Sequence, residues 1–159
     1  MAATPAVRVL EQAGVRHTLH SYDPDDHAPG AGFGAAAVAA LGADPEQVFK
    51  TLVARVDGAL TVAVVSVAGR LDLKALAAAA GGRRAVLAEP ADAERSSGYV
   101  RGGISPLGQR SPLPTVVDES ALLFDTVLVS AGRRGLQLEL DPAQLVRLTG
   151  ARTADIARC

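Results

Sequence analysis

The sequence has 159 residues, of which 48% are hydrophobic and 21% are charged, and its formal net charge is −1. This composition is that of a globular chain and not of a disordered one, and the length suits one domain with a sizeable core. The near-neutral charge argues against a protein that coats long stretches of nucleic acid, and no apolar run reaches the ~18–20 residues of a membrane span.

Helices and strands alternate along the chain, and local start and stop signals bound them. Thr4 before Pro5 is a helix start, and Gly14 follows the end of that helix. Asp57-Gly58 between two apolar runs predicts a tight hairpin. In chain order we expect a helix over 5–13, a strand over 16–22, a loop over 23–34, a small helix over 35–42, strands over 48–56 and 59–67, a helix from 72 to 80, a strand over 85–87, a helical turn after 90, a loop over 96–114, strands over 115–118 and 125–130, a turn over 131–135, a strand over 136–140 and a last helix from 142 to 149.

Interleaved helices and strands with at least one antiparallel hairpin predict a mixed sheet, which is an α/β or mixed α+β fold and not a purely parallel one. We see no repeat or linker, so residues 1–159 are expected to form a single domain. The first residues form a helix pattern without a basic-then-apolar signal, which predicts a cytoplasmic protein. The single cysteine, Cys159, is the last residue and is expected to be a free thiol.

Lys50 is the most unusual charged residue of the sequence. The chain has two lysines and fourteen arginines, and Lys50 falls within an apolar strand. In that strand it shares a face with Val48, Leu52 and Ala54, so it is the only charge on a face expected to be buried. A buried ammonium group needs compensation. Two interpretations stay open: Lys50 reaches solvent or a carboxylate, or it meets a ligand at the mouth of a cavity.

Two glycine-rich stretches are the other candidate binding elements. The segment RGGISPLGQR (101–110) contains the pair Gly102-Gly103, which allows close backbone approach to a ligand or a simple ordered connection. The segment AGRRG (131–135) places Arg133 and Arg134 in a turn, where they bind phosphate or face solvent. Together with Arg101 and Arg110 they suggest a local basic mouth.

Other familiar site patterns are weak or missing from the sequence. His17 and His20 fall on opposite faces of a strand and His27 lies in a loop, so a zinc site is not expected. The glycines of GAGFG (30–34) lack the spacing of a dinucleotide site, and no nucleophile elbow is present. We therefore predict neither a metal nor a cofactor.

Taken together, these stretches resemble the YbaK-type aminoacyl-tRNA deacylases, which are relatives of the editing domain inserted in bacterial prolyl-tRNA synthetases. The resemblance extends over essentially the whole chain, and its most specific segments are VFKTL, GGISPLGQ and SAGRRGL in combination. The further segments that carry it are TPAVRVLEQAGV, HSYDPD, LGADPEQ, VAVVSVAGRLDLKALAAAAG, SSGYVR, LPTVVDE, LQLEL and ADIAR.

The resemblance implies a barrel-like mixed sheet flanked by helices, with a cleft for the aminoacylated end of a tRNA. It implies catalytic roles for Lys50, Gly102 and Gly103. In some members an acidic residue follows RGL, where this chain has Gln137, whose amide can still hydrogen-bond a ligand. The implied substrate-binding residues are Tyr22, Phe33, Thr51, Ile104, Ser105, Pro106, Ser130, Gly132 and Gln137.

The implied function is removal of cysteine from mischarged Cys-tRNA(Pro), without a metal or cofactor. The substrate's own thiol is expected to attack the ester while the protein orients it. The expected partners are the CCA end of the tRNA and, as an open question, prolyl-tRNA synthetase, with no role for DNA or a membrane. Two alternatives remain: a deacylase for alanine or another small amino acid, and a non-catalytic module that binds a tRNA end or a nucleotide.

Overall fold

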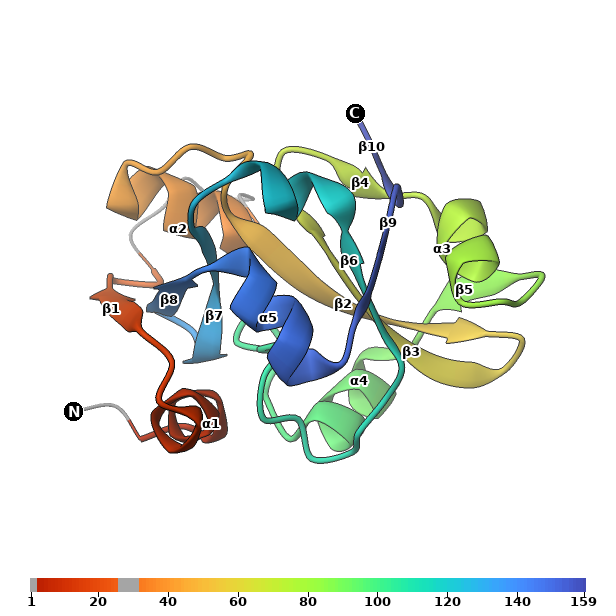
Figure 1. Cartoon of the computed structure of the whole chain (residues 1–159), viewed down its shortest axis with the longest axis horizontal. Helices are drawn as coiled ribbons and strands as arrows, with labels where there is room; N and C mark the ends of the chain where they lie inside the picture. Colours follow the sequence, from red (N-terminus) through yellow and green to blue (C-terminus); the bar gives the residue numbers. More distant parts are fainter. Residues whose placement is uncertain (1–2, 26–31) are drawn as a thin grey trace.

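The computed structural model describes residues 3–25 and 32–159, and Figure 1 shows helices packed around strands of mixed direction. The helices are α1 (Pro5–Ala13), α2 (Phe33–Leu41), α3 (Leu73–Ala79), α4 (Pro90–Ser97), α5 (Pro142–Thr149) and the 3₁₀ helix η1 (Glu119–Leu123). The strands are β1 (His17–Ser21), β2 (Phe49–Val56), β3 (Ala59–Ser66), β4 (Arg70–Leu71), β5 (Ala85–Leu87), β6 (Thr115–Asp118), β7 (Val127–Arg133), β8 (Leu136–Leu140), β9 (Arg152–Ala154) and β10 (Ala157–Arg158).

The strands form three sheets. The largest has the order β5-β2-β3-β6-β9, in which β2 is antiparallel to β3 and β5, whereas β6 is parallel to β3 and β9. A second sheet has the order β1-β8-β7 and is antiparallel throughout, and β10 pairs with β4. The mixed α/β fold predicted from the sequence is confirmed. Within the described residues no closed barrel is formed, because a single bridge between Val48 and Leu128 joins the two larger sheets.

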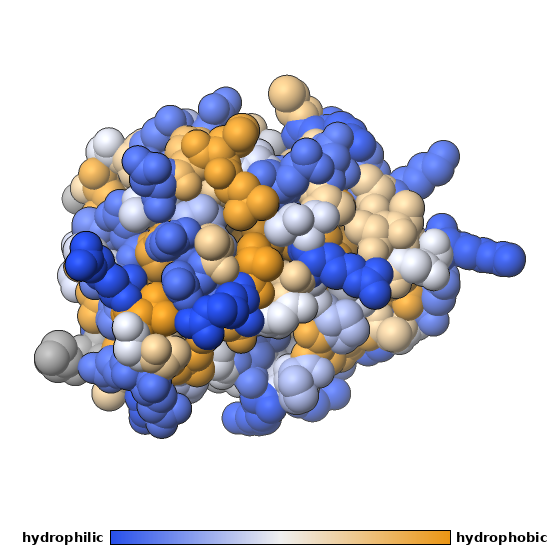
Figure 2. Space-filling view, in the orientation of Figure 1, coloured by the Kyte–Doolittle hydropathy of each residue, from blue (hydrophilic) through white to orange (hydrophobic). Residues whose placement is uncertain are grey.

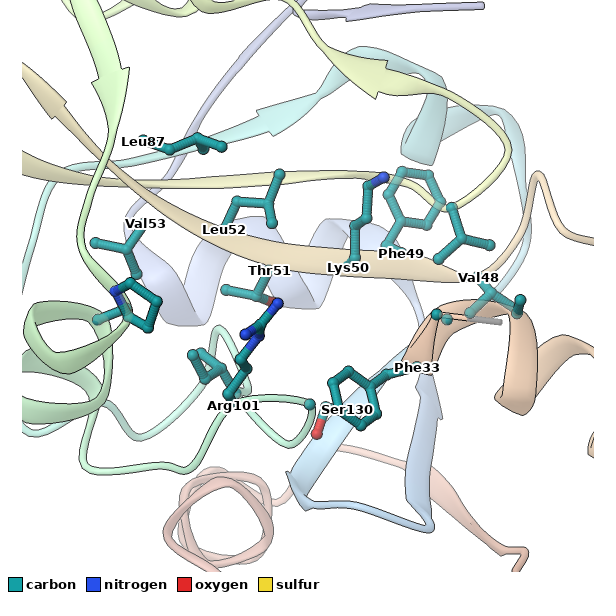
Figure 3. Close-up of a pocket in the computed structure, with 18 of the residues that line it drawn as sticks. Phe33, Val48, Phe49, Lys50, Thr51, Leu52, Val53, Leu87, Arg101 and Ser130 are labelled. Carbon is teal, nitrogen blue, oxygen red and sulfur yellow. The ribbon is translucent and has the colours of Figure 1, made fainter. Parts of the chain in front are cut away.

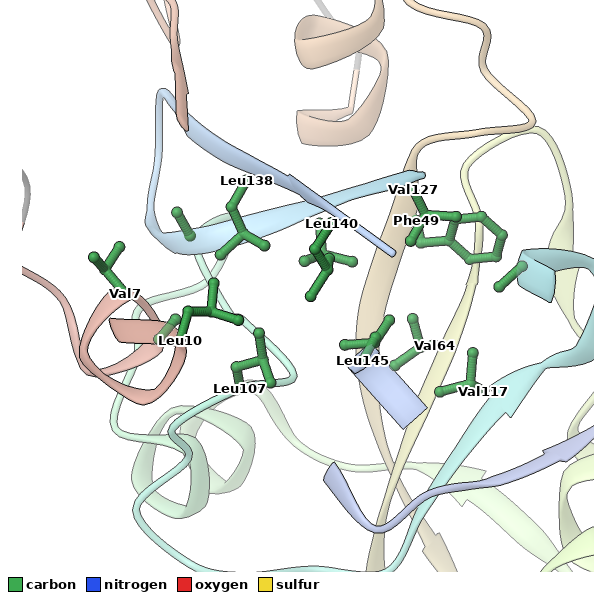
Figure 4. Packing of buried hydrophobic residues seen from close by; sticks show 14 of the residues in the cluster. Val7, Leu10, Phe49, Val64, Leu107, Val117, Val127, Leu138, Leu140 and Leu145 are labelled. Carbon is green, nitrogen blue, oxygen red and sulfur yellow. The ribbon is translucent and has the colours of Figure 1, made fainter. Parts of the chain in front are cut away.

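Two hydrophobic clusters cover the two faces of the large sheet. Side chains of β3 alternate between them: Val62 and Val64 belong to one cluster, and Ala63 and Val65 belong to the other. Both faces of this sheet are therefore buried, which is why its strands have near-continuous apolar sequences. Figure 4 shows the first cluster, in which β7 and β8 face α1, α5 and the large sheet.

The predicted hairpin is confirmed at the β2–β3 turn. Asp57 has φ 50° and Gly58 has φ 86°, so both central residues are in the left-handed region. Two such residues make a type I′ turn, whose twist matches that of the paired strands. The turn sets the register in which Phe49 lies opposite Ser66 and Val56 opposite Ala59.

Some boundaries differ from the sequence-based expectations. Helix α2 begins at Phe33, within the expected loop, and α4 is a full helix up to Ser97 where a single turn was expected. Strand β7 continues to Arg133 through an irregularity between Ser130 and Arg133, so the expected turn over 131–135 is shorter. A bulge keeps a glycine-containing segment in the sheet while bending it, and local composition does not reveal this.

The last residues of the chain are held by a buried carboxylate. Asp118 is 4% exposed, and its Oδ1 accepts hydrogen bonds from the backbone N–H groups of Ile156 at 2.9 Å and Ala157 at 3.1 Å. These contacts place β9 and β10, neither of which we predicted. Cys159 is a free, exposed thiol, as expected.

The outer surface mixes polar and apolar side chains. Figure 2 shows hydrophilic residues around the rim of one face and apolar residues gathered along its middle. The most exposed large apolar side chain is that of Leu123 in η1, with 82% of its surface accessible. None of the helices in the described parts of the chain is both long and apolar enough to cross a membrane.

Candidate functional site

A cleft of about 550 Å³ runs along the first half of β2 (Figure 3). Strand β5 pairs only with Ala54–Val56, so it leaves the earlier edge of β2 facing this cleft. The other walls come from the start of α2, from α4 and the loop behind it, and from β7 and β8. The volume lies in the range of small-molecule sites. Seven residues predicted from the sequence line the cleft: Phe33, Lys50, Thr51, Gly102, Ile104, Ser130 and Gln137.

Lys50 lies on the predicted face of β2, and its ammonium group is half-buried. The next side chains on that face, Leu52 and Ala54, pack in the cluster beneath α3. Lys50 Nζ donates a hydrogen bond to the carbonyl oxygen of Gly69 at 3.1 Å, and burial lowers the pKa of Lys50 below its ordinary value of 10.5. None of the ion pairs found among the described residues involves Lys50. One of the three N–H donors of the ammonium group thus bonds to a described residue, and Lys50 borders the cleft.

Two buried polar atoms of cleft-lining residues have no hydrogen-bond partner among the described residues. Thr51 Oγ1 and Gln137 Oε1 are inaccessible to solvent and make no hydrogen bond to any described residue. Burying an unsatisfied polar group costs about 1–3 kcal/mol, and native proteins rarely tolerate it without a reason. Ser130 stands directly opposite Gln137 in the β7–β8 pair. This wall therefore contains polar side chains whose hydrogen-bonding capacity is only partly used by the described residues.

An aromatic ring covered by a cation forms one rim of the cleft. Phe33 is 40% exposed, and the Arg134 guanidinium carbon lies 4.7 Å from the centre of its ring. This distance is that of a cation–π contact. The backbone of Gly102 packs against the same ring, since a Cβ there would lie 2.8 Å from ring carbons. The Phe33 ring is thus held in place while part of the residue stays exposed.

Two predicted binding residues lie outside the lining and support a turn. The backbone N–H of Tyr22 donates to the carbonyl of Gly135 at 2.9 Å, which fixes the β7–β8 turn. Gly132 has φ 110°, and a Cβ on it would lie 2.8 Å from Tyr99 Cε1. Both positions shape the site from behind, so their direct contact with substrate stays a prediction.

Three further predicted residues, Gly103, Ser105 and Pro106, are buried within the loop behind α4 and do not line the cleft. Ser105 Oγ accepts a hydrogen bond from the N–H of Leu107 at 3.3 Å. Tyr99 donates its hydroxyl hydrogen to the carbonyl of Leu107 at 2.7 Å, and burial raises the pKa of Tyr99 to about 12. These contacts hold the loop whose edge reaches the cleft.

Part of the lining was missed by the sequence-based prediction. Arg101 lines the cleft, although the sequence suggested it only as part of a local basic mouth. The apolar wall was not predicted at all, because these side chains read as ordinary core residues. That wall consists of Val48, Phe49, Leu52, Val53, Val67, Leu87, Ala88, Pro90 and Ala93.

The histidines have structural partners where the structure describes them. His20 Nε2 lies 2.9 Å from Glu139 Oε1, and His17 Nδ1 lies 2.8 Å from the carbonyl of Val15. Hydrogen bonds from Thr126 and His20 lower the pKa of Glu139. Across residues 3–25 and 32–159 no group of three or more potential metal ligands converges. His27 and the first glycine of GAGFG lie outside the described residues.

The cleft can position and polarise a ligand. Its described lining offers a lysine, an arginine, two hydroxyl groups and an amide, and contains no histidine, cysteine or carboxylate. Charges and dipoles fixed in a partly dry cleft stabilise developing charge without reorganising. The arrangement therefore suits the binding of a polar ligand and the stabilisation of negative charge that develops on it.

Known proteins resemble this chain over nearly all of its length. A protein of Enterococcus faecalis, EbsC, named as a candidate Cys-tRNA(Pro)/Cys-tRNA(Cys) deacylase, is 37% identical over 157 residues, which are 96% of this chain and 92% of that protein. A crystal structure of a candidate trans-editing enzyme for prolyl-tRNA synthetase superposes with a TM-score of 0.81 at 27% identity, covering 99% of this chain and 100% of the other. A crystal structure of a hypothetical protein superposes with a TM-score of 0.85 at 26% identity, covering 98% of this chain and 100% of the other.

The aminoacyl-tRNA editing domain matches residues 27–148 of the sequence. This match includes Lys50, the segment from Gly102 to Pro106, and both strands that contribute Ser130 and Gln137. Together with the 37% identical relative, it shows that the chain belongs to the aminoacyl-tRNA editing domain family.

Proposed function

We propose that the protein is a trans-editing aminoacyl-tRNA deacylase that removes cysteine from Cys-tRNA(Pro) in the cleft beside β2. The name of the 37% identical relative supports this substrate, and the family match supports the type of reaction. The observation that carries the proposal is that Lys50, Thr51 and Gln137 line one cleft of about 550 Å³. Such a volume suits an aminoacylated nucleoside at the end of a tRNA.

Residues 1–159 act as one editing unit in this proposal. The substrate is presented as the single-stranded CCA end of the tRNA, which needs only a local cationic and aromatic surface. Prolyl-tRNA synthetase is the natural partner, because it produces the mischarged tRNA. The cytoplasm is the expected compartment for an enzyme of translation.

The aminoacyl group has complementary partners in the cleft. Its α-ammonium group faces the polar residues of the lining, Thr51, Ser130 and Gln137. Lys50 remains a cation, faces the ribose and the ester, and stabilises negative charge on the ester oxygens. The side chain of the amino acid packs against the apolar wall formed by Leu52, Val53 and neighbouring residues.

The reaction needs no nucleophile from the protein. The substrate thiol attacks its own ester carbonyl, a C–S bond forms, and the bond from the carbonyl carbon to the ribose oxygen breaks. The ribose oxygen receives the proton that the thiol loses, and the cysteine leaves as a cyclic thioester. Holding the thiol near the carbonyl supplies much of the rate acceleration, because orientation replaces a bimolecular encounter.

The test is a deacylation assay with purified tRNA(Pro) charged with cysteine, alanine or serine. We expect fast release of cysteine and slow release of serine, whose hydroxyl is a much poorer nucleophile. Serine released as fast as cysteine would refute the thiol-dependent step. Preference for alanine would move the protein to a deacylase for small amino acids, and release of none would make it a non-catalytic tRNA-end-binding module.

A further inference from the structure

Two arginines from distant parts of the chain meet at the rim of the cleft. Arg134 Nε donates a hydrogen bond to the carbonyl oxygen of Arg101 at 2.7 Å. The same guanidinium lies over the ring of Phe33, 4.7 Å from its centre. A single side chain thus connects the β7–β8 turn, the loop behind α4 and the start of α2.

The glycine pair beside Arg101 makes this meeting possible. A Cβ on Gly103 would lie 2.7 Å from the Cα atom of Arg133 and 2.8 Å from the backbone nitrogen of Arg134. A Cβ on Gly102 would lie 2.8 Å from the ring of Phe33. Real Cβ atoms do not approach other atoms so closely, so only glycine lets the loop lie directly on the turn. The two glycines therefore hold Arg101 next to Arg134.

The backbone of Arg101 is fixed on both sides, while its side chain enters the cleft. Its N–H donates to Glu94 Oε2 at 2.8 Å, and its carbonyl accepts from Arg134. Figure 3 shows the side chain of Arg101 extending toward β2 on the side of Thr51, whereas Lys50 projects from the other side of the strand. The Arg134 guanidinium is thus held by its hydrogen bond and by stacking on Phe33, and the Arg101 side chain extends from a fixed backbone.

We propose that Arg101 and Arg134 form a phosphate clamp at the mouth of the cleft. The clamp binds the phosphodiester on the 5′ side of the terminal nucleoside, and the exposed part of the Phe33 ring contacts a base. This inference rests on the proposed function for the identity of the natural ligand. Lys50 keeps its proposed position facing the ribose and the ester.

The chemistry of the two groups fits this assignment. Guanidinium groups match the geometry of phosphate oxygens, because they present parallel N–H donors. The Nε of Arg134 donates to the carbonyl of Arg101 and its flat face stacks on Phe33, so its terminal N–H groups can bind a phosphate. Bases in single-stranded nucleic acids stack on aromatic rings beside cationic grooves. The net charge of −1 is compatible with such a site, since the clamp requires charge only at the rim.

The test compares the binding of three ligands that carry no amino acid: adenosine, 5′-AMP and the trinucleotide CCA. Each is titrated at several salt concentrations into wild type, Arg101→Ala, Arg134→Lys and Arg83→Ala. Arg83 is an exposed arginine on the segment between α3 and β5 and does not line the cleft, so its loss controls for net charge. Thermal unfolding of each variant verifies that the fold is kept.

We expect Arg101→Ala to weaken the binding of AMP and CCA by about 10- to 100-fold and to leave adenosine unaffected. The slope of log K against log salt for CCA should fall by about 0.7 for each lost phosphate contact. Arg134→Lys keeps the charge but loses the fork and the stacking, so it should weaken the binding of CCA as well. Arg83→Ala should change neither the affinities for AMP and CCA nor the salt slope for CCA.

An equal loss of adenosine binding in Arg101→Ala, or an equal effect of Arg83→Ala, would overturn the clamp. Failure of the clamp is separable from failure of the proposed function. If Cys-tRNA(Pro) is deacylated but its salt dependence is the same in Arg101→Ala, the clamp is wrong and the function stands. If CCA binding depends on both arginines but no charged tRNA is deacylated, the function is wrong and the clamp stands.

Discussion

Replacing Gly102 by alanine tests how the loop behind α4 supports the site. Gly102 has φ +86°, and a Cβ there would lie 2.8 Å from three carbons of the Phe33 ring. The ring is 40% exposed, so it can move away without disturbing the core. We therefore expect Gly102→Ala to displace Phe33 and to leave the fold intact.

The expected size of the effect has two parts. A left-handed backbone costs an alanine roughly 1–2 kcal/mol of stability, which lowers the melting temperature of a chain of this length by about 2–8 °C. Stacking of a base on an aromatic ring contributes about 1–3 kcal/mol, so a displaced ring should reduce kcat/KM for Cys-tRNA(Pro) by about 5- to 140-fold.

The matched control is Gly58→Ala in the β2–β3 hairpin. Gly58 has the same φ of +86°, and a Cβ there would meet no atom within 4 Å. This variant should lose a similar amount of stability and retain wild-type kcat/KM. Thermal unfolding and steady-state deacylation are measured on both variants. Equal activity of the two variants would refute the idea that contact between Gly102 and Phe33 shapes the site.

Three further predictions concern single side chains. Because burial lowers the pKa of Lys50 and its cationic form is the active one, the rate of enzymatic deacylation, after subtraction of spontaneous hydrolysis, should decline at alkaline pH with a midpoint below 10.5. The substrate thiol must lose its proton to attack, so a rise of the rate near neutrality belongs to the substrate. A rate that stays constant through the alkaline range would contradict a cationic role of Lys50. Asp118→Ala removes the acceptor of the Ile156 and Ala157 N–H groups and also that of the Ser120 N–H, so the free energy of unfolding in urea should fall by about 2–6 kcal/mol. The exposed Asp155→Ala should change it by no more than about 1 kcal/mol. Hydrogen bonds from Thr126 and His20 lower the pKa of Glu139 below 4.5. The stability that this carboxylate contributes is therefore complete above pH 4.5 and is lost as the pH falls through the lowered pKa. The difference in melting temperature between wild type and Glu139→Gln should shrink on acidification, and a difference independent of pH would contradict this.

Elements with strong local signals could be predicted from the sequence. Thr4 caps α1 by accepting a hydrogen bond from the N–H of Val7, and Gly14 ends that helix with φ 66°. The β2–β3 hairpin follows from Asp57-Gly58 in the same way. In both cases the residues that determine the element lie next to it in the chain, so pattern and structure agree.

Elements that depend on distant contacts could not be predicted. Strands β4 and β10 are two residues long and pair across more than 80 positions, with Arg70 opposite Arg158. Their position depends on the carboxylate of Asp118, which no local pattern connects to the end of the chain. The same reason explains why the apolar wall of the cleft was missed, since its side chains come from four separate segments: β2, the residue after β3, the end of β5, and α4.

The glycine pair shows how the site differs from its sequence-based interpretation. Glycines 102 and 103 suggested close approach of a ligand to the backbone, whereas in the structure they allow close approach of Phe33 and of the β7–β8 turn. Lys50, in contrast, lies on the predicted face of β2 and borders the cleft, with the carbonyl of Gly69 as its protein partner. The face of a strand follows from its periodicity, but the contacts of a glycine depend on the tertiary fold.

The most direct test of the account is the single-turnover deacylation of Cys-tRNA(Pro) by wild type and by Lys50→Ala. We expect wild type to release cysteine rapidly and the variant to be slower by at least about 100-fold, because a fixed cation near the ester is lost. The melting temperature of the variant should stay close to that of wild type, since the half-buried ammonium makes one hydrogen bond to the protein. Release of cysteine by a folded Lys50→Ala variant at the wild-type rate would contradict the account.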